Sequence, residues 1–207
     1  MKERQASRLD KTVNGDAAPP SLQAWVASHD VQFYENDEFL FNSVGDFLTT
    51  GVRLGQPIVV VATAAHRKGY RDAMRARGVN PDDLTEGRDA VWLDARETLA
   101  AFMEGGHPNV ELFELTVGRV LESLRRNRRY IMIRAHGEMV DLLWREGKSD
   151  AAIALECMWN DLATRYSFSL LCTYSRQTLA NVLKADGVDR ICSCHARVLP
   201  SEASSSA

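Results

Sequence analysis

The chain has 207 residues, 45% of them apolar, and its 25 basic and 28 acidic side chains give a formal net charge of −3. This length and composition fit one globular domain with or without tails, and they exclude a collagen-like or wholly disordered chain. The nearly balanced charge gives no general attraction to nucleic acid or anionic lipid. Apolar runs such as residues 58–62 are far too short to cross a bilayer, and the charged start does not resemble a secretory leader. We therefore expect a cytoplasmic protein that contacts neither nucleic acid nor a membrane directly.

Both ends of the chain have the composition of segments that bury too little surface to become ordered. Residues 1–28 combine charged side chains with the turn-forming pairs Asn14-Gly15 and Pro19-Pro20, and residues 200–207 contain four serines. The sequence therefore predicts a flexible N-terminal arm (1–28), one domain (29–199) and a disordered tail (200–207). Because a chain of this length can build a core and shows no export signal, its four cysteines are expected to stay reduced.

The first half of the domain alternates short β-rich runs with stretches of helical periodicity. Strands are expected at residues 31–34, 58–61 and 90–93, and the middle run, which is apolar without interruption, indicates a strand buried on both faces. The intervening helices begin at the N-cap residues Asn36, Thr63 and Asp94. Gly51 is expected to end the first helix in a left-handed conformation.

The second half continues the alternation. Strands are expected at 130–133 and 168–172, and helices at 109–127, 137–147, 150–166 and from Arg176 toward Cys192. The pair Gly105-Gly106 is expected to join two helices. Alternating strands and helices are typical of a parallel sheet covered by helices, so the predicted fold is an α/β three-layer sandwich with a mostly parallel central sheet of at least five strands.

The sequence contains none of the common phosphate-binding or nucleophile motifs. The turn after the first strand, Tyr34 to Glu38, is acidic and lacks the glycines and lysine of a P-loop, and no G-x-G-x-x-G or G-x-S-x-G is present. We therefore expect neither an enzyme nor a bound cofactor.

The segment Cys192-Ser193-Cys194-His195 places three possible metal ligands within four residues. The C-x-C spacing is less usual for zinc than C-x-x-C, and no second cysteine pair follows it. Completing a site would require tertiary contacts with more distant donors, namely Cys157, Cys172, His29, His66 or His136. The alternative is a helix end that carries small, reduced cysteines, so no metal is assigned.

The linear pattern of the domain resembles the MEDS domain, the methanogen/methylotroph DcmR sensory domain. The matching stretches are His29-Asp30-Val31-Gln32-Phe33-Tyr34-Glu35, Gly55 to Thr63 with His66-Arg67, Leu93-Asp94-Ala95, Arg134 with Gly137-Glu138-Met139-Val140, Trp159-Asn160-Asp161-Leu162, and Phe168 to Tyr174. They follow one another in order across nearly the whole domain.

The resemblance implies a RecA/KaiC-like α/β domain that lacks the P-loop and senses small hydrocarbon derivatives in prokaryotic signal transduction, for example in two-component systems. Members of the family are often joined to a kinase or a DNA-binding domain, and the 207 residues leave room for neither. The expected partners are therefore a small organic ligand and a separate signalling protein, such as a histidine kinase or a transcription regulator, with a homo-oligomer as a further possibility.

Ligands of open α/β sheets bind beyond the carboxyl ends of the strands. The ligand pocket is expected to involve the imidazole, phenol, guanidinium and carboxyl groups of His29, Tyr34, His66, Arg134, Glu138 and Tyr174. Arg134 and Glu138 would form either a ligand anchor or a buried salt bridge.

Two alternatives remain open at this point. A ligand-free adaptor would be favoured by an exposed apolar patch on the helix of Trp144 or of Trp159. A degenerate nucleotide-binding domain would bind ATP with Mg²⁺ despite the missing loop.

Overall fold

The computed structural model describes residues 27–126, 132–177 and 187–201. The predicted arm lies almost wholly outside these residues, as does most of the predicted tail. The helix predicted from Arg176 is described only at its start and, as α10, at its end.

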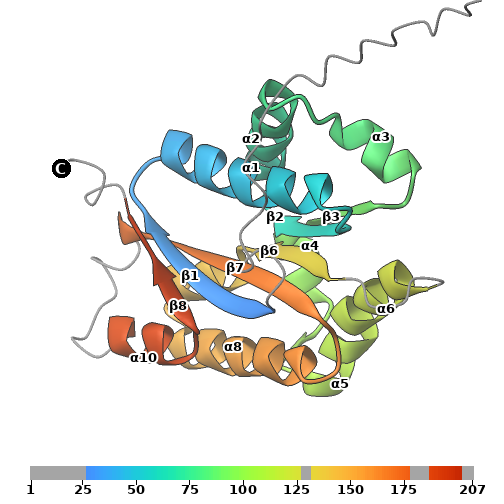
Figure 1. The fold of residues 1–207 in the computed structure, drawn as a ribbon. Coiled ribbons are helices and arrows are strands. Elements are labelled where there is room, and N and C mark those ends of the chain that lie inside the picture. Colours follow the sequence, from blue (N-terminus) through green and yellow to red (C-terminus); the bar gives the residue numbers. More distant parts are fainter. Residues whose placement is uncertain (1–26, 127–131, 178–186, 202–207) are drawn as a thin grey trace, which may run out of the picture.

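Six parallel strands form the central sheet, in the order β3-β2-β6-β7-β1-β8 (Figure 1). The strands are β1 (Ser28–Tyr34), β2 (Ile58–Ala62), β3 (Ala90–Asp94), β6 (Ile133–Gly137), β7 (Phe168–Ser175) and β8 (Arg197–Leu199). The predicted α/β fold with a parallel central sheet is confirmed, and every pairing within this sheet is parallel.

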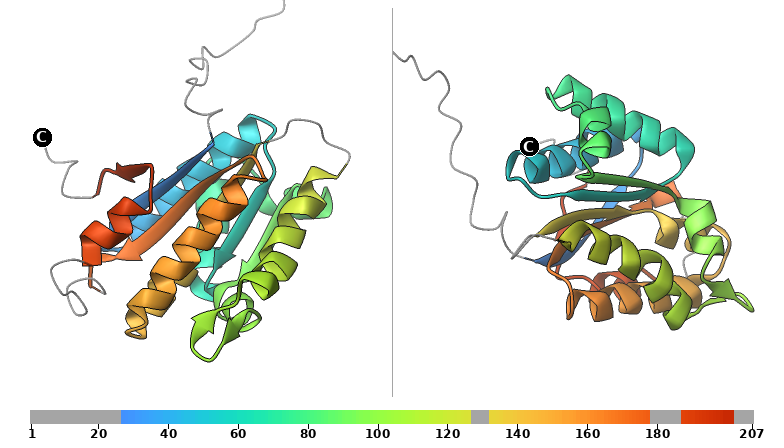
Figure 2. Two further views of the ribbon diagram at one scale, coloured as in Figure 1. Left: turned by 90° about the horizontal axis from the view of Figure 1, so that it is seen from below. Right: turned by 90° about the vertical axis from the view of Figure 1, so that its right-hand side faces the viewer.

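Helices cover both faces of the sheet (Figures 1 and 2). One face carries α1 (Asp37–Arg53), α2 (Ala64–Ala76) and α3 (Pro81–Glu86). The other carries α4 (Ala95–Ala100), α5 (Val110–Phe113), the π-helical segment η2 (Glu114–Gly118), α6 (Arg119–Arg125), α7 (Met139–Arg145), α8 (Ser149–Ala163) and α10 (Gly187–Ser193). No helix within the described residues is long and apolar enough to cross a membrane.

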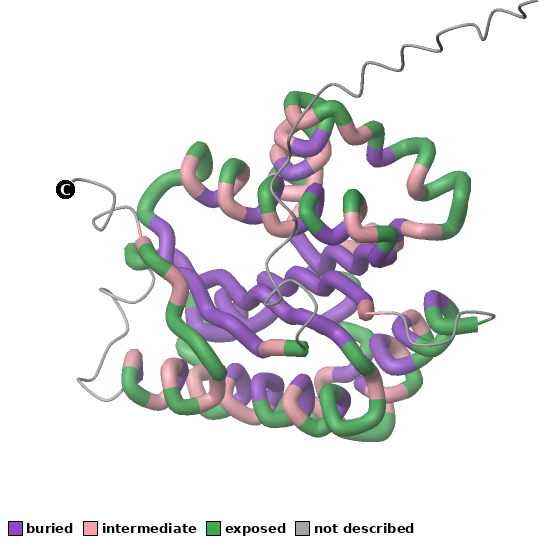
Figure 3. The backbone as a smooth tube through the Cα atoms, viewed as in Figure 1, coloured by how far each residue is buried: buried purple, intermediate pink, exposed green. Residues whose placement is uncertain are grey.

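The sheet separates two hydrophobic cores, because successive side chains of a strand point to opposite faces. On β2, Val59 and Val61 belong to the core on the α8 face, whereas Ile58, Val60 and Ala62 pack on the α1 face. The four inner strands β1, β2, β6 and β7 are accordingly buried along most of their length, whereas the edge strands β3 and β8 are largely half-buried or exposed (Figure 3). This alternation decides which polar side chains of the sheet can meet.

The predicted N-caps are all confirmed. The side chains of Asn36, Thr63 and Asp94 accept hydrogen bonds from backbone N–H groups of the helices that follow them, as N-cap residues do.

Gly51 has a different role from the one predicted. It lies inside α1, which continues to Arg53, and the left-handed residue is Gly55, with φ of 72°. A Cβ atom on Gly51 would lie 2.2 Å from Cγ of Arg134, so glycine is required there for the close approach of α1 to β6.

Three further predictions about elements are corrected. The fourth strand is described at Ile133–Gly137 and so ends four residues later than predicted, while residues 130 and 131 of the predicted range lie outside the described residues. The later end was missed because the polar residues Arg134 and His136 are buried in the sheet. Gly105-Gly106, both with positive φ, form the turn of a hairpin between β4 (Met103–Glu104) and β5 (His107–Pro108) instead of joining two helices. The short strand β8 was not predicted, since only three residues pair with β1.

Candidate functional site

A network of polar side chains lies at the carboxyl ends of the strands, centred on Glu138. The helix after β2 lies on one face of the sheet and the helix after the neighbouring β6 lies on the other, which makes this edge a topological switch point. Thr63 directly follows β2 and Glu138 directly follows β6. The fold thus brings the start of α2 to the residue that precedes α7.

The buried carboxylate of Glu138 accepts three hydrogen bonds. Its Oε1 lies 2.6 Å from Nδ1 of His66 and 2.5 Å from the hydroxyl of Tyr70, and its Oε2 accepts the backbone N–H of Thr63 at 3.0 Å. Nε2 of His136 lies 3.1 Å from the same Tyr70 hydroxyl. We call these residues the Glu138 network.

The surroundings stabilise a negative charge on Glu138 and a positive charge on His66. Burial by itself would raise the pKa of Glu138, but hydrogen bonds and positive charge from His136 and His66 hold it well below its ordinary value. Burial also lowers the pKa of His66, and the hydrogen bond and charge of Glu138 outweigh this effect, so that the pKa of His66 is raised. The network therefore favours a carboxylate next to an imidazolium.

A second group of polar side chains continues the network along α7. Arg145 donates to the Tyr34 hydroxyl at 3.2 Å and pairs with Asp141 at 2.7 Å, while Asp141 accepts the backbone N–H of Ser175 at 3.1 Å. Burial raises the pKa of the Asp141 carboxyl and of the Tyr34 phenol. One side of α7 is thus held to the ends of β1 and β7 by two hydrogen bonds, while the ion pair lies within the helix.

The raised pKa of His66 predicts a pH-dependent stability. The pair with Glu138 is fully formed below the ordinary histidine pKa of 6.5, and its contribution is lost as the pH rises through the raised pKa of the folded state. We expect His66→Gln to lower the free energy of unfolding by about 1–3 kcal/mol in weak acid, and the difference from wild type to shrink toward alkaline pH.

Urea unfolding at a series of pH values measures this difference. His107→Gln, at an exposed position of the β4–β5 hairpin, is the control and should match wild type throughout. A His66→Gln effect of constant size across the pH range would show that charge on His66 does not contribute.

The structure brings together three of the six predicted pocket residues, Tyr34, His66 and Glu138. Arg134 lies at the other end of β6, where it donates to Gln56 at 2.7 Å and its guanidinium lies over Phe47. Four residues of extended strand separate Cα atoms by about 13 Å, so Arg134 and Glu138 form neither the predicted anchor nor the predicted salt bridge.

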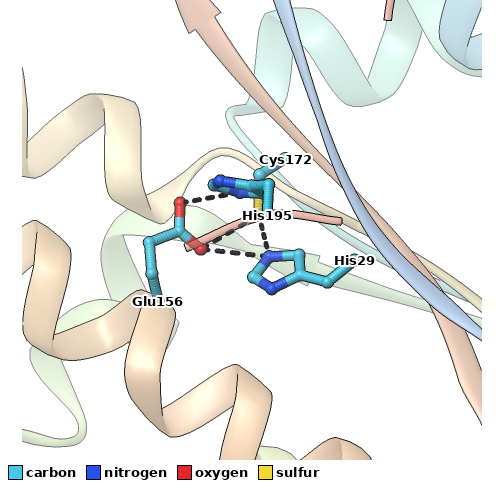
Figure 4. A group of neighbouring side chains, drawn as sticks. All are labelled: His29, Glu156, Cys172 and His195. Atoms are coloured by element: carbon cyan, nitrogen blue, oxygen red, sulfur yellow. Dashed lines mark hydrogen bonds and ion pairs between the residues drawn. The ribbon is translucent and has the colours of Figure 1, made fainter. Parts of the chain in front are cut away.

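His29 and Tyr174 lie on the opposite face of the sheet, where both contact Glu156. Figure 4 shows His29 in this second polar cluster. There His29, on β1, and Cys172, on β7, meet Glu156 of α8 and His195, which follows α10. One ligand-type atom from each of the four lies within 4.8 Å of the other three. We call these four residues the Glu156 cluster.

Glu156 is completely buried at the centre of this cluster. Its Oε2 lies 3.1 Å from Nε2 of His29, and its Oε1 lies 3.4 Å from Nε2 of His195 and 2.5 Å from the Tyr174 hydroxyl. Burial by itself would raise the pKa of the carboxyl, but the neighbouring imidazoles of His195 and His29 hold that pKa far below its ordinary value.

Sequence reasoning missed Glu156, and the structure brings one of the three possible ligands of the segment 192–195 to the cluster. His195 belongs to the cluster, whereas Cys192 and Cys194 do not, and the Sγ of Cys194 instead donates to the carbonyl of Arg190. One signal was available: Glu156 lies on the apolar face of a helical pattern, between Leu155 and Trp159, where an unpaired carboxylate would be costly.

A hollow of about 270 Å³ opens between α4, the β4–β5 hairpin and α7. Its apolar lining comes from Leu99, Met103, Leu142 and Leu143, and its polar lining from Arg96, Glu146 and Lys148. Leu142 and Leu143 of α7 face the hollow, whereas Asp141 and Arg145 of the same helix contact the ends of β7 and β1. A small volume with apolar walls and a charged rim suits a small molecule with one polar group.

The sequence model of one protein family matches residues 28–196. The family is described as MEDS, the methanogen/methylotroph, DcmR sensory domain. A search among curated proteins finds no match. The matched range includes all of the Glu138 network, the Glu156 cluster and the hollow beside α7.

Proposed function

The chain belongs to the MEDS family of sensory domains, and from this premise we propose that it binds a small organic ligand and passes the signal to a partner protein in prokaryotic signal transduction. The proposed ligand is a hydrocarbon derivative, that is, a short apolar skeleton with one polar group. Neither catalysis nor a bound nucleotide is part of the proposal.

The observation that carries this proposal is the hollow between α4 and α7. Its apolar walls can cover a short hydrocarbon skeleton, and Arg96, Glu146 and Lys148 at its rim can receive a hydroxyl, carboxylate or amine. Burying the skeleton supplies roughly 25 cal/mol per Å² of apolar surface, which favours modest affinity for a molecule this small.

Helix α7 offers a route from the ligand to the rest of the molecule. It lines the hollow through Leu142 and Leu143, and it contacts the ends of β1 and β7 through Asp141 and Arg145. A ligand that shifts α7 would therefore disturb the hydrogen bonds of Tyr34 and of the adjoining Glu138. In this proposal the Glu138 network responds to the ligand and does not hold it.

Protein-observed NMR with millimolar 1-butanol, dichloromethane or butyrate tests the proposal. We expect at least one of these probes to give saturable shifts in the amide signals of α4, β4, β5 and α7. Ala100→Phe, at the exposed end of α4 beside the hollow, should fill the space and weaken binding at least about tenfold, which corresponds to about 1.4 kcal/mol.

Ala163→Phe is the matched control, since Ala163 is the exposed last residue of α8 and lies outside the lining of the hollow. It should bind as wild type does. Shifts that rise without saturation, or that persist unchanged in Ala100→Phe, would overturn the hollow as the ligand site.

A ligand-free adaptor is the second candidate. An exposed apolar patch on the helix of Trp144 or of Trp159 would favour it, but the exposed large apolar side chains of the described residues lie on neither helix. Val110 and Leu115, on the adjoining segments α5 and η2, are 52% and 49% exposed and offer the apolar surface that such an adaptor would use.

A further inference from the structure

The donor atoms of the Glu156 cluster are spaced like the corners of a metal coordination shell. Nε2 of His29 lies 3.1 Å from Oε2 of Glu156 and 3.3 Å from Sγ of Cys172, and that sulfur lies 3.5 Å from the same oxygen. Zinc bonds of about 2.0–2.3 Å arranged as a tetrahedron place neighbouring ligand atoms about 3.3–3.8 Å apart. Small movements would bring all four donors onto one ion.

Both imidazoles are held in the orientation that a metal ligand needs. Nδ1 of His29 lies 2.9 Å from Oδ1 of Asn160, and Nδ1 of His195 lies 2.7 Å from the carbonyl oxygen of Ile191. The oxygens of Asn160 and Ile191 can only accept hydrogen bonds, so Nδ1 of each histidine carries the hydrogen. In a neutral imidazole the lone pair is then on Nε2, the nitrogen that lies next to Glu156. Metal-binding histidines in proteins are commonly fixed by such outer hydrogen bonds.

The outer partners are themselves fixed. The amide of Asn160 donates to the carbonyl of Cys194 at 3.0 Å, which turns its oxygen toward His29. The hydroxyl of Tyr174 donates to Glu156. By contrast, Nε2 of His195 is buried and has no hydrogen-bond partner of good geometry, although it lies 3.4 Å from Oε1 of Glu156. A cation at the centre would satisfy this nitrogen.

The charges also balance. A thiolate at Cys172 and the carboxylate of Glu156 carry two negative charges, which a divalent ion neutralises in a fully buried site. From the spacing, the ring orientations and this balance, we propose that His29, Glu156, Cys172 and His195 bind one divalent transition-metal ion. Loading replaces the S–H bond of Cys172 with a metal–sulfur bond and releases the proton to solvent, without electron transfer.

The donor set selects among ions. Imidazole nitrogen and thiolate sulfur are poor ligands for Mg²⁺ and Ca²⁺, which bind oxygen, whereas two nitrogens, one oxygen and one sulfur in a compact shell suit Zn²⁺. With four protein donors the shell is closed, as in structural or regulatory zinc sites. The ion would join β1 and β7 to α8 and to the segment between α10 and β8, and would therefore stabilise the fold.

Cobalt titration of the chelator-treated, reduced full-length chain tests the proposal. We expect one Co²⁺ per chain, strong visible bands of four-coordinate cobalt, a thiolate-to-cobalt band in the near ultraviolet, and loss of all bands when Zn²⁺ is added. Asn160→Ala leaves all four donors in place but removes the outer hydrogen bond to His29, together with the bond from Asn160 to the Cys194 carbonyl, and should weaken the affinity about 10–100-fold.

Two cysteine variants assign the sulfur. Cys172→Ser should lose the thiolate band, whereas Cys157→Ser, at an exposed position of α8 next to Glu156, should keep it. If Cys172→Ser does not fold, the wild-type cobalt spectrum and the variant His195→Gln test the site instead. His195→Gln should weaken the affinity for Co²⁺ as well. Each of three results would overturn the site. Wild type could show no cobalt bands, it could show only the weak bands of six-coordinate cobalt, or Cys157→Ser could lose the thiolate band.

Discussion

Glu138→Ala is expected to lower the free energy of unfolding by about 3–5 kcal/mol, the cost of breaking a buried ion pair by removing one partner. The substitution leaves His66, the Tyr70 hydroxyl and the backbone N–H of Thr63 without their acceptor in a buried place. Because the pKa of Glu138 is lowered, its contribution is fully present above its ordinary value of 4.5 and is lost only as the pH falls through the folded-state pKa.

Chemical denaturation at neutral pH measures this loss. Glu146→Ala is the control at the opposite end of α7, since Glu146 follows the last residue of the helix, its side chain is 42% exposed and its ion pairs lie at the surface. It should change the stability by less than about 1 kcal/mol. Equal losses in the two variants would mean that the Glu138 network contributes no more than a surface pair.

Trp159→Ala is expected to cost a similar 3–5 kcal/mol, typical of removing a large buried aromatic side chain. The Trp159 ring is 1% exposed and lies edge-on to Phe113 and to Phe168, with ring centroids 5.3 and 5.9 Å away. It therefore joins α8 to α5 and to β7. Since Glu156 lies one helical turn earlier on α8, the same change should also loosen the Glu156 cluster.

Thermal and urea unfolding compare this variant with Trp92→Ala. Trp92 is only partly buried on the edge strand β3, where it lies beneath the guanidinium of Arg71, so its removal should cost a smaller amount, about 1–2 kcal/mol. If the two tryptophan variants lost the same stability, the contacts of Trp159 with Phe113 and Phe168 would add no more to the free energy of unfolding than the partly buried Trp92 does.

The fold could be predicted from local signals because those signals agree with the tertiary structure. The apolar run of β2 is buried on both faces, and the side chains of Asn36, Thr63 and Asp94 cap the helices they were expected to cap. Predictions failed where tertiary contacts override local pattern. Arg134 and His136 interrupt the apolar run of β6 and are nevertheless buried, since Gln56 and the Leu171 carbonyl provide partners from distant parts of the chain.

The candidate site was predicted only in part, and strand geometry explains why. His29 and Tyr34 lie on one strand but five residues apart, so their side chains point to opposite faces and lie at opposite ends. Applying this alternation to the sequence would have separated them. That His29 meets Glu156 and His195 depends on how α8 and α10 pack on the sheet, which no local pattern contains.

Strand β8 has a consequence for solubility. It pairs with β1 through only three residues, Arg197 to Leu199, and an ion pair of 2.6 Å between Arg197 and Asp30 fastens it there. Without this short strand, the outer edge of β1 would present unpaired backbone donors and acceptors to any other extended chain. The three residues cover Asp30 to Gln32 of β1 and so leave fewer of these groups open to edge-to-edge aggregation.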